Sequence, residues 1–312
     1  MPNNRFLAID LGGTKLAAAV FTKAGEMIAR EHQPLDKAGR SAVGSQICDV
    51  VSRYSSEADS VGICVPGIYR HASGTVWAPN IPGWDDYPLR AEAQAAAGAV
   101  PVTIDSDRAC YILGERWKGN AQGCTDAVFM AVGTGIGAGV LSGGHVVRGA
   151  HDIAGAVGWM ALDRPYRNEY DACGCFESQC SGDGIAKVAT ALLRDTPEYS
   201  GSLGNVGPEP VTSRDVFAAF AKGDMIAERT IAQCVELWGM AAANLVSIFD
   251  PEKIIFGGGV FGPAVALIPR IRDEAAKWAQ PIAMRTVEFT ASALGTDAGI
   301  YGAGLLAKEN AD

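Results

Sequence analysis

The chain has 312 residues, a formal net charge of −9, 48 % hydrophobic residues and 20 % charged residues. This composition is typical of a globular protein with a sizeable core. The acidic balance, without any run of Lys or Arg, argues against nucleic acid or an anionic membrane as a partner. We find no signal peptide and no apolar stretch long enough to cross a bilayer, so we expect a cytoplasmic protein. The eight scattered cysteines favour free thiols over a disulfide framework.

The first elements along the chain predict an α/β unit. Residues 5–22 read as a strand, a glycine-rich turn and a second strand. The elements that follow are a weakly patterned helix (40–56), a buried strand (61–67), a loop-rich segment (75–84), a helix (88–98) and a strand (100–105).

The second part of the chain repeats this layout and then becomes more helical. Residues 129–141 again give an apolar arm, a glycine turn and an apolar arm, which suggests two similar lobes facing one cleft. Later elements are helices (183–195 and 214–249), a strand that runs into a glycine turn (252–263, with Pro263 opening a helix) and a small-residue helix (296–309). We place the domain boundary near residue 118.

The turn from Asp10 to Lys15 is the first candidate ligand loop. Gly12 and Gly13 allow close backbone approach to a phosphate, and Thr14 and Lys15 add donors. Asp10, at a strand end, is suited to hold a divalent ion through water. The Walker pattern is absent and no helix follows, so a plain hairpin turn remains the alternative.

Two further glycine clusters interrupt apolar runs. The cluster from Gly133 to Gly139 resembles a dinucleotide motif, but that motif must open a helix, whereas this segment continues as a hairpin. Gly257-Gly258-Gly259 lies at a predicted strand-to-helix junction, where glycines would let a base or ribose pack on the backbone.

Asp107 follows a predicted strand and begins a predicted helix. An Asp at such a place is most often a helix N-cap, and a catalytic carboxylate is the competing interpretation.

Taken together, these segments resemble the ROK family (repressors, open reading frames, kinases) of the sugar kinase/actin-like ATPase fold. The resemblance covers nearly the whole chain and rests on the order of short motifs. These motifs are IDLGGTK (9–15), VPG (65–67), APNIPGW (78–84), SDRACYILGE (106–115), GTGIGAGV (133–140), AGAVGW (154–159), CFES (175–178) and FGGG (256–259).

The resemblance implies an α/β fold of two domains, of the actin-like (ribonuclease H-like) type, closing on a sugar with ATP and Mg²⁺ in the cleft. The domains would span residues 1–118 and 119–295, with the final helix (about 296–312) packed back on the first. The match by position also assigns residue roles. Asp107 would be the catalytic base, and Asp10 would hold magnesium through water. The nucleotide would be held by Gly12, Gly13, Thr14, Lys15, Thr134, Gly135, Gly257 and Gly258. The sugar would be bound by Gly67, Asn80, Ser106, Asp107, Trp159 and Glu177.

The sequence departs from the family in the sugar pocket. Ser106 replaces the usual Asn before the base, Ala156 replaces a Glu and Trp159 replaces a His. Trp159 would stack on a pyranose ring or fill space, and His151, Asp152 or Arg108 are alternative sources of the lost contacts.

The same comparison speaks against zinc at the stretch "ACGCFESQC" (172–180). Only Cys175 matches a family ligand, since Asn168, Tyr170 and Trp159 occupy the other positions. A set made of Cys173, Cys175, Cys180 and His151 is the alternative, but its spacing is not typical of structural zinc. We therefore expect no zinc.

We thus predict an ATP-dependent kinase (a transferase) that phosphorylates a hydroxyl, most simply the 6-hydroxyl, of a hexose or modified sugar. The alternatives are a non-catalytic sugar-binding or sensor protein of the same family, and a kinase of a cyclitol-like analogue. A DNA-binding repressor is disfavoured because only nine residues precede Asp10. A homodimer is the family expectation.

Overall fold

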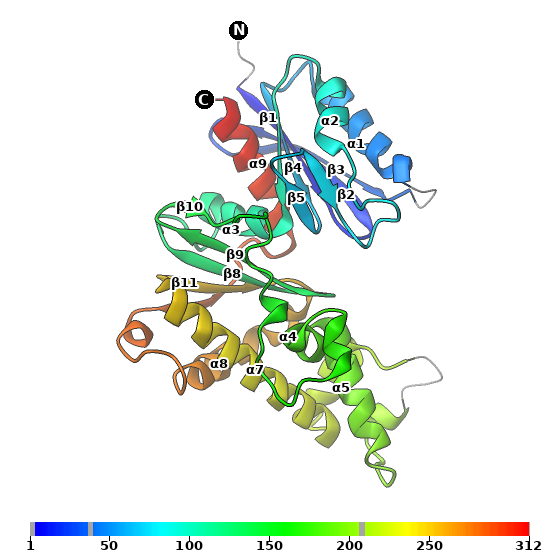
Figure 1. Cartoon of the computed structure of the whole chain (residues 1–312), viewed down its shortest axis with the longest axis vertical. Coiled ribbons are helices and arrows are strands. Elements are labelled where there is room, and N and C mark those ends of the chain that lie inside the picture. Colours follow the sequence, from blue (N-terminus) through cyan, green and yellow to red (C-terminus); the bar gives the residue numbers. More distant parts are fainter. Residues whose placement is uncertain (1–3, 37–39, 206–209, 312) are drawn as a thin grey trace.

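The computed structural model describes residues 4–36, 40–205 and 210–311. They form two lobes, one above the other in Figure 1. Each lobe is built on a five-stranded mixed sheet, and a two-stranded sheet of β5 (Ile68–Arg70) and β6 (Thr75–Trp77) belongs to the first lobe.

The first sheet combines an antiparallel meander with two added parallel strands. Its order is β3-β2-β1-β4-β7, with β1 (Arg5–Leu11), β2 (Lys15–Thr22), β3 (Met27–Pro34), β4 (Ser60–Val65) and β7 (Val102–Ser106). Strands β1, β2 and β3 pair antiparallel, whereas β4 joins β1, and β7 joins β4, in parallel. Parallel strands end at one edge, so β1, β4 and β7 present their carboxyl ends together.

The second sheet repeats this plan. Its order is β10-β9-β8-β11-β12, with β8 (Ala127–Val132), β9 (Ile136–Ser142), β10 (His145–Val146), β11 (Lys253–Gly257) and β12 (Glu288–Ala291). Strands β8 to β10 are antiparallel, and β11 and β12 are added in parallel. The internal repeat predicted from the two glycine hairpins is therefore confirmed.

Helices cover both sheets. They are α1 (Arg40–Tyr54), α2 (Leu89–Ala97), α3 (Asp107–Lys118), α4 (Cys175–Cys180), α5 (Gly182–Arg194), α6 (Ser213–Phe220), α7 (Met225–Phe249), α8 (Ile268–Ala275) and α9 (Ala298–Ala311). Short 3-10 turns include η1 (Val157–Trp159) and η4 (Gly259–Phe261). Along β1, Leu7 and Ile9 pack in one core cluster with α1 and α2, and Ala8 packs with α3 and α9 in another. This alternation is the two-residue period of a strand covered on both faces.

Helix α3 joins the two lobes. Its Cys110 and Leu113 pack with β1, β2 and α9, whereas its Ile112 packs with β8, β9 and β11. The terminal helix α9 packs on β1 and β4 of the first sheet, as shown by the red helix in Figure 1. We keep residue 118, the end of α3, as the proposed domain boundary.

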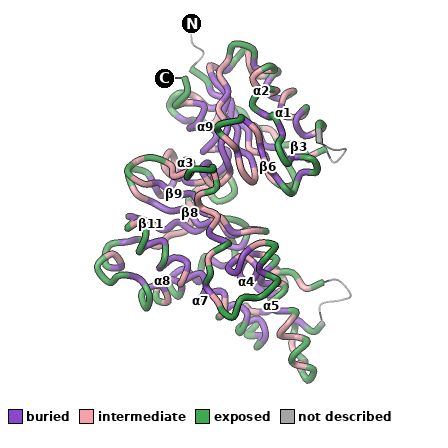
Figure 2. Tube along the Cα trace, viewed as in Figure 1, coloured by how far each residue is buried: buried purple, intermediate pink, exposed green. Residues whose placement is uncertain are grey.

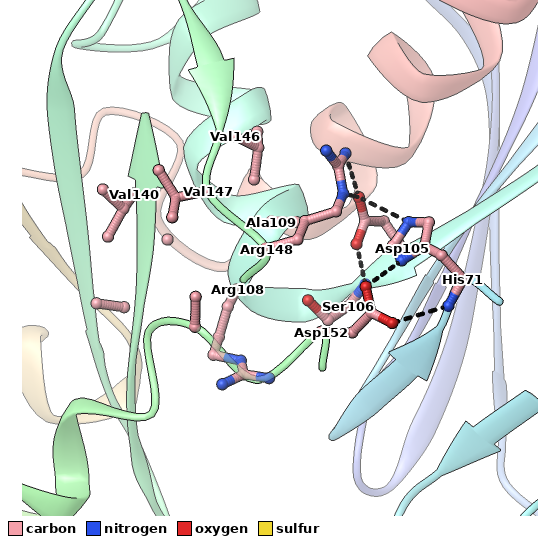
Figure 3. A pocket seen from close by; sticks show the side chains of 13 residues that line it. His71, Asp105, Ser106, Arg108, Ala109, Val140, Val146, Val147, Arg148 and Asp152 are labelled. Carbon is pink, nitrogen blue, oxygen red and sulfur yellow. Dashed lines mark hydrogen bonds and ion pairs between the residues drawn. The ribbon is translucent and has the colours of Figure 1, made fainter. Parts of the chain in front are cut away.

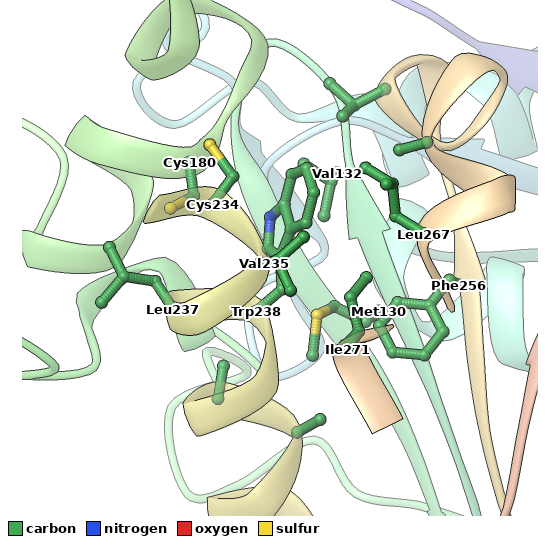
Figure 4. Packing of buried hydrophobic residues seen from close by; sticks show 14 of the residues in the cluster. Met130, Val132, Cys180, Cys234, Val235, Leu237, Trp238, Phe256, Leu267 and Ile271 are labelled. Carbon is green, nitrogen blue, oxygen red and sulfur yellow. The ribbon is translucent and has the colours of Figure 1, made fainter. Parts of the chain in front are cut away.

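The helix α7 forms the centre of the second lobe. Its length and apolar composition alone would suffice for a membrane span, but 61 % of its most apolar window is buried inside the protein, as in a core helix. Its Trp238 lies among β8, β11 and α8 side chains, and its Cys234 lies beside Cys180 of α4 (Figure 4). In Figure 2 the buried residues (purple) fill the interior of both lobes, and in the second lobe they include one side of this helix.

Several elements differ from the predictions. The segment 214–249 is two helices, because Gly223 adopts a positive φ and Asp224 caps α7. Strand β3 was not predicted, since as an edge strand with a mostly exposed pattern it carries little apolar signal. Pro263 opens a 3-10 turn, and α8 begins only at Ile268.

Candidate active site

Two carboxylates lie at the carboxyl edge of the first sheet. Asp10 is near the end of β1 and Asp107 is the first residue of α3, directly after β7. The register places Asp10 beside Cys64 of β4, and Cys64 beside Asp105 of β7. Burial is the main reason that the pKa of Asp107 is raised, and the charge of Asp10 adds to this effect. The fold thus brings together the two acidic residues that the sequence singled out.

Asp107 is partly buried and has a basic carboxylate. Burial raises its pKa to about 6, against the opposing effects of the Arg108 charge and of the Arg108 N–H, which donates to Oδ1 at 2.8 Å. The N-cap of α3 is Ser106 and not Asp107, so the N-cap interpretation of Asp107 is wrong. A carboxylate with this pKa is ionised at neutral pH and still able to accept a proton.

Asp10 has an environment suited to a hard cation. Burial raises its pKa to about 6, while a hydrogen bond from Cys64 and the charge of Lys15 lower it. The start of α9 comes close, because a Cβ on Gly299 would lie 2.7 Å from Asp10 Oδ2. A partly exposed single carboxylate fits a magnesium ion that keeps most of its water shell. Asp10 is the residue that would hold it.

The first glycine turn connects β1 to β2 without a helix. The Gly12 N–H donates to the Lys15 carbonyl at 3.0 Å, and Gly13, Thr14 and Lys15 are exposed. A Cβ on Gly13 would lie 3.6 Å from Asn80 Nδ2, so Asn80 flanks this turn. The prediction of a hairpin that is not a Walker loop is confirmed.

Gly67 requires its glycine for conformational and steric reasons. It has φ +81°, and a Cβ there would lie 2.2 Å from the Trp77 carbonyl oxygen. Its backbone therefore lies against the segment that leads to Asn80.

The second glycine turn connects β8 to β9, which confirms that no dinucleotide-type helix follows. The Gly133 N–H donates to the Gly135 carbonyl at 2.9 Å, and the Gly182 N–H donates to the Gly133 carbonyl at 2.7 Å. Thr134 at its tip is exposed. The turn is thus held by the start of α5 and leaves its outer side open.

The third glycine cluster lies beside the second. Strand β11 pairs Gly257 with Ala131 of β8, and Gly258 has φ +87° with its Cβ position 2.4 Å from the Val132 carbonyl oxygen. Gly257 itself is buried, and a Cβ there would lie 2.2 Å from the Phe129 ring. The glycine at 257 is therefore required by core packing, while the exposed Gly258 faces outward.

Glu177 joins the proposed sugar and nucleotide segments. Its Oε2 accepts the Ile136 N–H at 2.6 Å, and Cβ atoms on Gly135 and Gly158 would lie 2.8 and 2.9 Å from this carboxylate or its stem. Burial raises its pKa. Three predicted site residues or their neighbours, Gly135, Glu177 and the 154–159 segment, are therefore in contact.

The remaining predicted sugar residues have distinct environments. Ser106 is 8 % exposed, and its N–H donates to Asp105 Oδ1. Trp159 is 57 % exposed, so it does not fill interior space. Of the proposed substitutes for the lost contacts, Asp152 is engaged with His71 and Arg108 with backbone carbonyls.

The cysteines do not form a metal cluster or a disulfide. All eight are free, as predicted. Cys180 is fully buried beside Cys234 (Figure 4), and burial raises its pKa. Across the described ranges no group of three His, Cys, Asp or Glu side chains is gathered as a metal site.

Sequence reasoning missed two buried acids. Asp105 accepts the Arg148 Nε and Nη2 at 2.9 and 2.7 Å. Glu115 accepts the Asn120 N–H at 2.6 Å and contacts the segment before α9. Each acid lies within an apolar strand or helix, and this placement was the signal in the sequence that the acid is buried. A buried carboxylate needs a hydrogen-bonding or charged partner.

The comparisons with known proteins agree with this architecture. The family model described as "ROK family" matches residues 6–310. A glucokinase of Halalkalibacterium halodurans is 31 % identical, over 99 % of this chain and 96 % of its own. An N-acetyl-D-glucosamine kinase of Citrobacter koseri is 26 % identical, over 96 % of this chain and 98 % of its own.

A solved structure has the same arrangement. The ROK family glucokinase from Streptomyces griseus, in complex with glucose and AMPPNP, superposes with a TM-score of 0.78 at 28 % identity, over 98 % of this chain and 99 % of that one. The chain therefore belongs to the ROK family and has its two-lobed α/β fold of the actin-like ATPase type.

Proposed function

We propose that this enzyme, an ATP-dependent sugar kinase, transfers the γ-phosphoryl group to the 6-hydroxyl of a hexose or modified sugar, with Asp107 as the general base. The observation that carries the proposal is the Asp107 carboxylate, which has a pKa of about 6 and lies at the same carboxyl edge of the first sheet as Asp10. Family membership supports the reaction class.

The chemistry requires a base because a sugar hydroxyl is a poor nucleophile. As the new O–P bond forms and the bond to the β-phosphate oxygen breaks, Asp107 takes the hydroxyl proton and ADP leaves. A pKa near the working pH suits that transfer. Magnesium at Asp10 would supply positive charge to the phosphate oxygens.

The nucleotide would be held by backbone and small side chains from both lobes. We assign this role to Gly12, Gly13, Thr14, Lys15, Thr134, Gly135 and Gly258, with Gly257 supporting the last by its place at the end of β11. Backbone N–H groups in such turns bind phosphate without adding net positive charge, which fits an acidic protein.

The sugar would lie among Gly67, Asn80, Ser106, Trp159 and Glu177. Glucose and N-acetyl-D-glucosamine are the sugars named for relatives. Ala156 offers no acceptor and Trp159 presents an exposed apolar face. Hydroxyl specificity depends on paired polar groups, so we favour a modified sugar, an amino sugar, a glycoside or a cyclitol-like analogue over plain glucose.

We further propose a cytoplasmic homodimer, on the basis of family membership. Light scattering coupled to size-exclusion chromatography measures the assembly directly, and a monomer at working concentration would contradict the dimer.

The test of function is ADP release in the presence of a sugar panel. Hexoses, amino sugars, N-acyl sugars, glycosides and cyclitols are each added to enzyme, ATP and MgCl₂. We expect at least one acceptor to raise ADP release and to yield a phosphorylated product by mass spectrometry. Binding of a sugar without any ADP release or product would instead indicate a non-catalytic sensor.

A further inference from the structure

A group of charged side chains joins the two lobes beside the candidate site. His71, between β5 and β6, and Asp105 of β7 come from the first lobe, while Arg148 and Asp152 come from the segment after β10 in the second. We call these four residues the interlobe clasp. Figure 3 shows them converging next to Ser106.

The central contact of the clasp is a buried carboxylate with its cation in the other lobe. The Asp105 side chain is 3 % exposed, and its Oδ2 accepts two N–H groups of Arg148, Nε at 2.9 Å and Nη2 at 2.7 Å. A buried carboxylate is strongly disfavoured without such a partner. The lobes therefore cannot separate at this point without exposing or stranding the charge.

A second contact crosses the lobes close by. Asp152 Oδ2 accepts the His71 N–H at 3.0 Å, and Asp152 Oδ1 lies 2.7 Å from His71 Nδ1. Asp152 has φ +57°, a left-handed backbone conformation that is uncommon for residues other than Gly. Arg108 adds a third link, since its Nη1 and Nη2 donate to the carbonyls of Ile153 and Gly67 at 3.3 and 3.4 Å.

Both ends of the clasp lead directly into the candidate site. On one side, Asp105 Oδ1 accepts the Ser106 N–H at 2.8 Å, immediately before Asp107. On the other side, residues 148–153 continue into 154–159, which contact Glu177. A shift of the clasp would therefore move the sugar-side segment relative to Asp107.

We propose that Arg148 and Asp152 are positioning residues, which fix residues 154–159 against the first lobe and so set the distance between a bound acceptor and Asp107. Neither side chain needs to touch the substrate. The kinetic part of this inference depends on the proposed sugar kinase activity, whereas the structural part does not.

The kinetic test compares Arg148→Met, Arg148→Lys and Asp152→Asn with wild type, using the acceptor found in the sugar panel. Misplacement by about 1 Å costs roughly 100-fold in rate, so we expect Arg148→Met to lower kcat/KM for the sugar by ~10- to 100-fold. The KM for ATP should stay within about 2-fold. Arg148→Lys should recover part of the loss, because one charged donor remains.

A matched control removes an ion pair that stays within one lobe. Arg53 Nη2 lies 2.7 Å from Glu31 Oε1, and both residues belong to the first lobe. Arg53→Met should leave both KM values and kcat unchanged. If Arg148→Met behaves like this control, or raises the KM for ATP as much as that for the sugar, the positioning role is refuted.

A second variant guards against misfolding. Arg148→Met strands a buried charge, whereas the double variant Asp105→Asn with Arg148→Met removes both charges. The double variant should fold by circular dichroism and still show the loss in kcat/KM for the sugar. Wild-type kcat/KM in the folded double variant would overturn the proposal.

Hydrogen exchange provides a readout without catalysis. In wild type, backbone amides of residues 147–160 should exchange slowly, and Arg148→Met should raise their exchange while Arg53→Met does not. Unchanged exchange in Arg148→Met refutes the clasp. Faster exchange together with a wild type that phosphorylates no sugar would support the clasp and refute the proposed activity.

Discussion

Asp107→Asn should slow phosphoryl transfer and, at the same time, stabilise the fold at neutral pH. A general base contributes about 10²- to 10⁴-fold to rate, so we expect a loss of kcat of that size. Asparagine keeps an oxygen that accepts the Arg108 N–H, which donates to Asp107 Oδ1 at 2.8 Å, and it carries no charge into the half-buried site.

The gain in stability follows from the pKa of the carboxyl group. Folding raises it from 3.8 to about 6, so the folded state holds the proton more tightly than the unfolded state. Each unit of pKa shift corresponds to about 1.36 kcal/mol, so the shift gives roughly 3 kcal/mol as an upper value, and solvent screening of a partly exposed group reduces this to about 1–2 kcal/mol. Above pH 6 wild type carries this whole cost, and below pH 3.8 it carries none.

Urea unfolding of both proteins between pH 4 and pH 8 measures the effect. Asp107→Asn should be more stable at pH 7.5, and the difference should shrink as the pH falls through 6 towards 4. In wild type, kcat/KM should also fall as the pH drops through about 6. A variant with near-normal turnover would refute the base assignment, and a variant less stable than wild type at pH 7.5 would refute the argument from burial.

Three other changes test separate parts of the structure. Gly302→Ala should destabilise the fold by about 1–3 kcal/mol, because the new Cβ would lie 1.9 Å from the Cys110 carbonyl oxygen in α3. Gly262→Ala is the control, since its nearest atom lies at 3.5 Å, and it should leave the melting temperature unchanged. Glu177→Gln should raise the KM for the sugar ~10-fold or more. Glu177→Ala should also raise the KM for ATP, because it leaves the Ile136 N–H unpaired. Unchanged KM values in both variants would show that Glu177 is not part of the site. EDTA should abolish turnover and MgCl₂ restore it, and elemental analysis should find no stoichiometric zinc; one zinc per chain would contradict that expectation.

The sequence predicted the fold well where its signals are local and strong. The apolar arms around Gly12-Gly13 and Gly133–Gly137 are long, and both form hairpins. Edge strands such as β3 and β12 were missed because they are short or half exposed and carry little apolar pattern.

The candidate site was less accessible to sequence reasoning. Asp10 and Asp107 stand out as acids at strand ends, so they could be chosen without coordinates. The partnership of Asp105 with Arg148 could not, because it joins residues from two lobes and depends on how α3 packs between the sheets. Likewise, the close approach of the Phe129 ring to Gly257 could not be inferred from the sequence.

The most direct test asks which oxygen of the acceptor receives the phosphate and whether the transfer depends on Asp107. The acceptor that most strongly raises ADP release is incubated with wild type and with Asp107→Asn, and the product is analysed by ³¹P and ¹³C NMR. We predict a phosphate on the primary, 6-position oxygen from wild type and almost none from the variant. Equal product from both proteins, or no phosphorylated acceptor from wild type, would contradict the central claim.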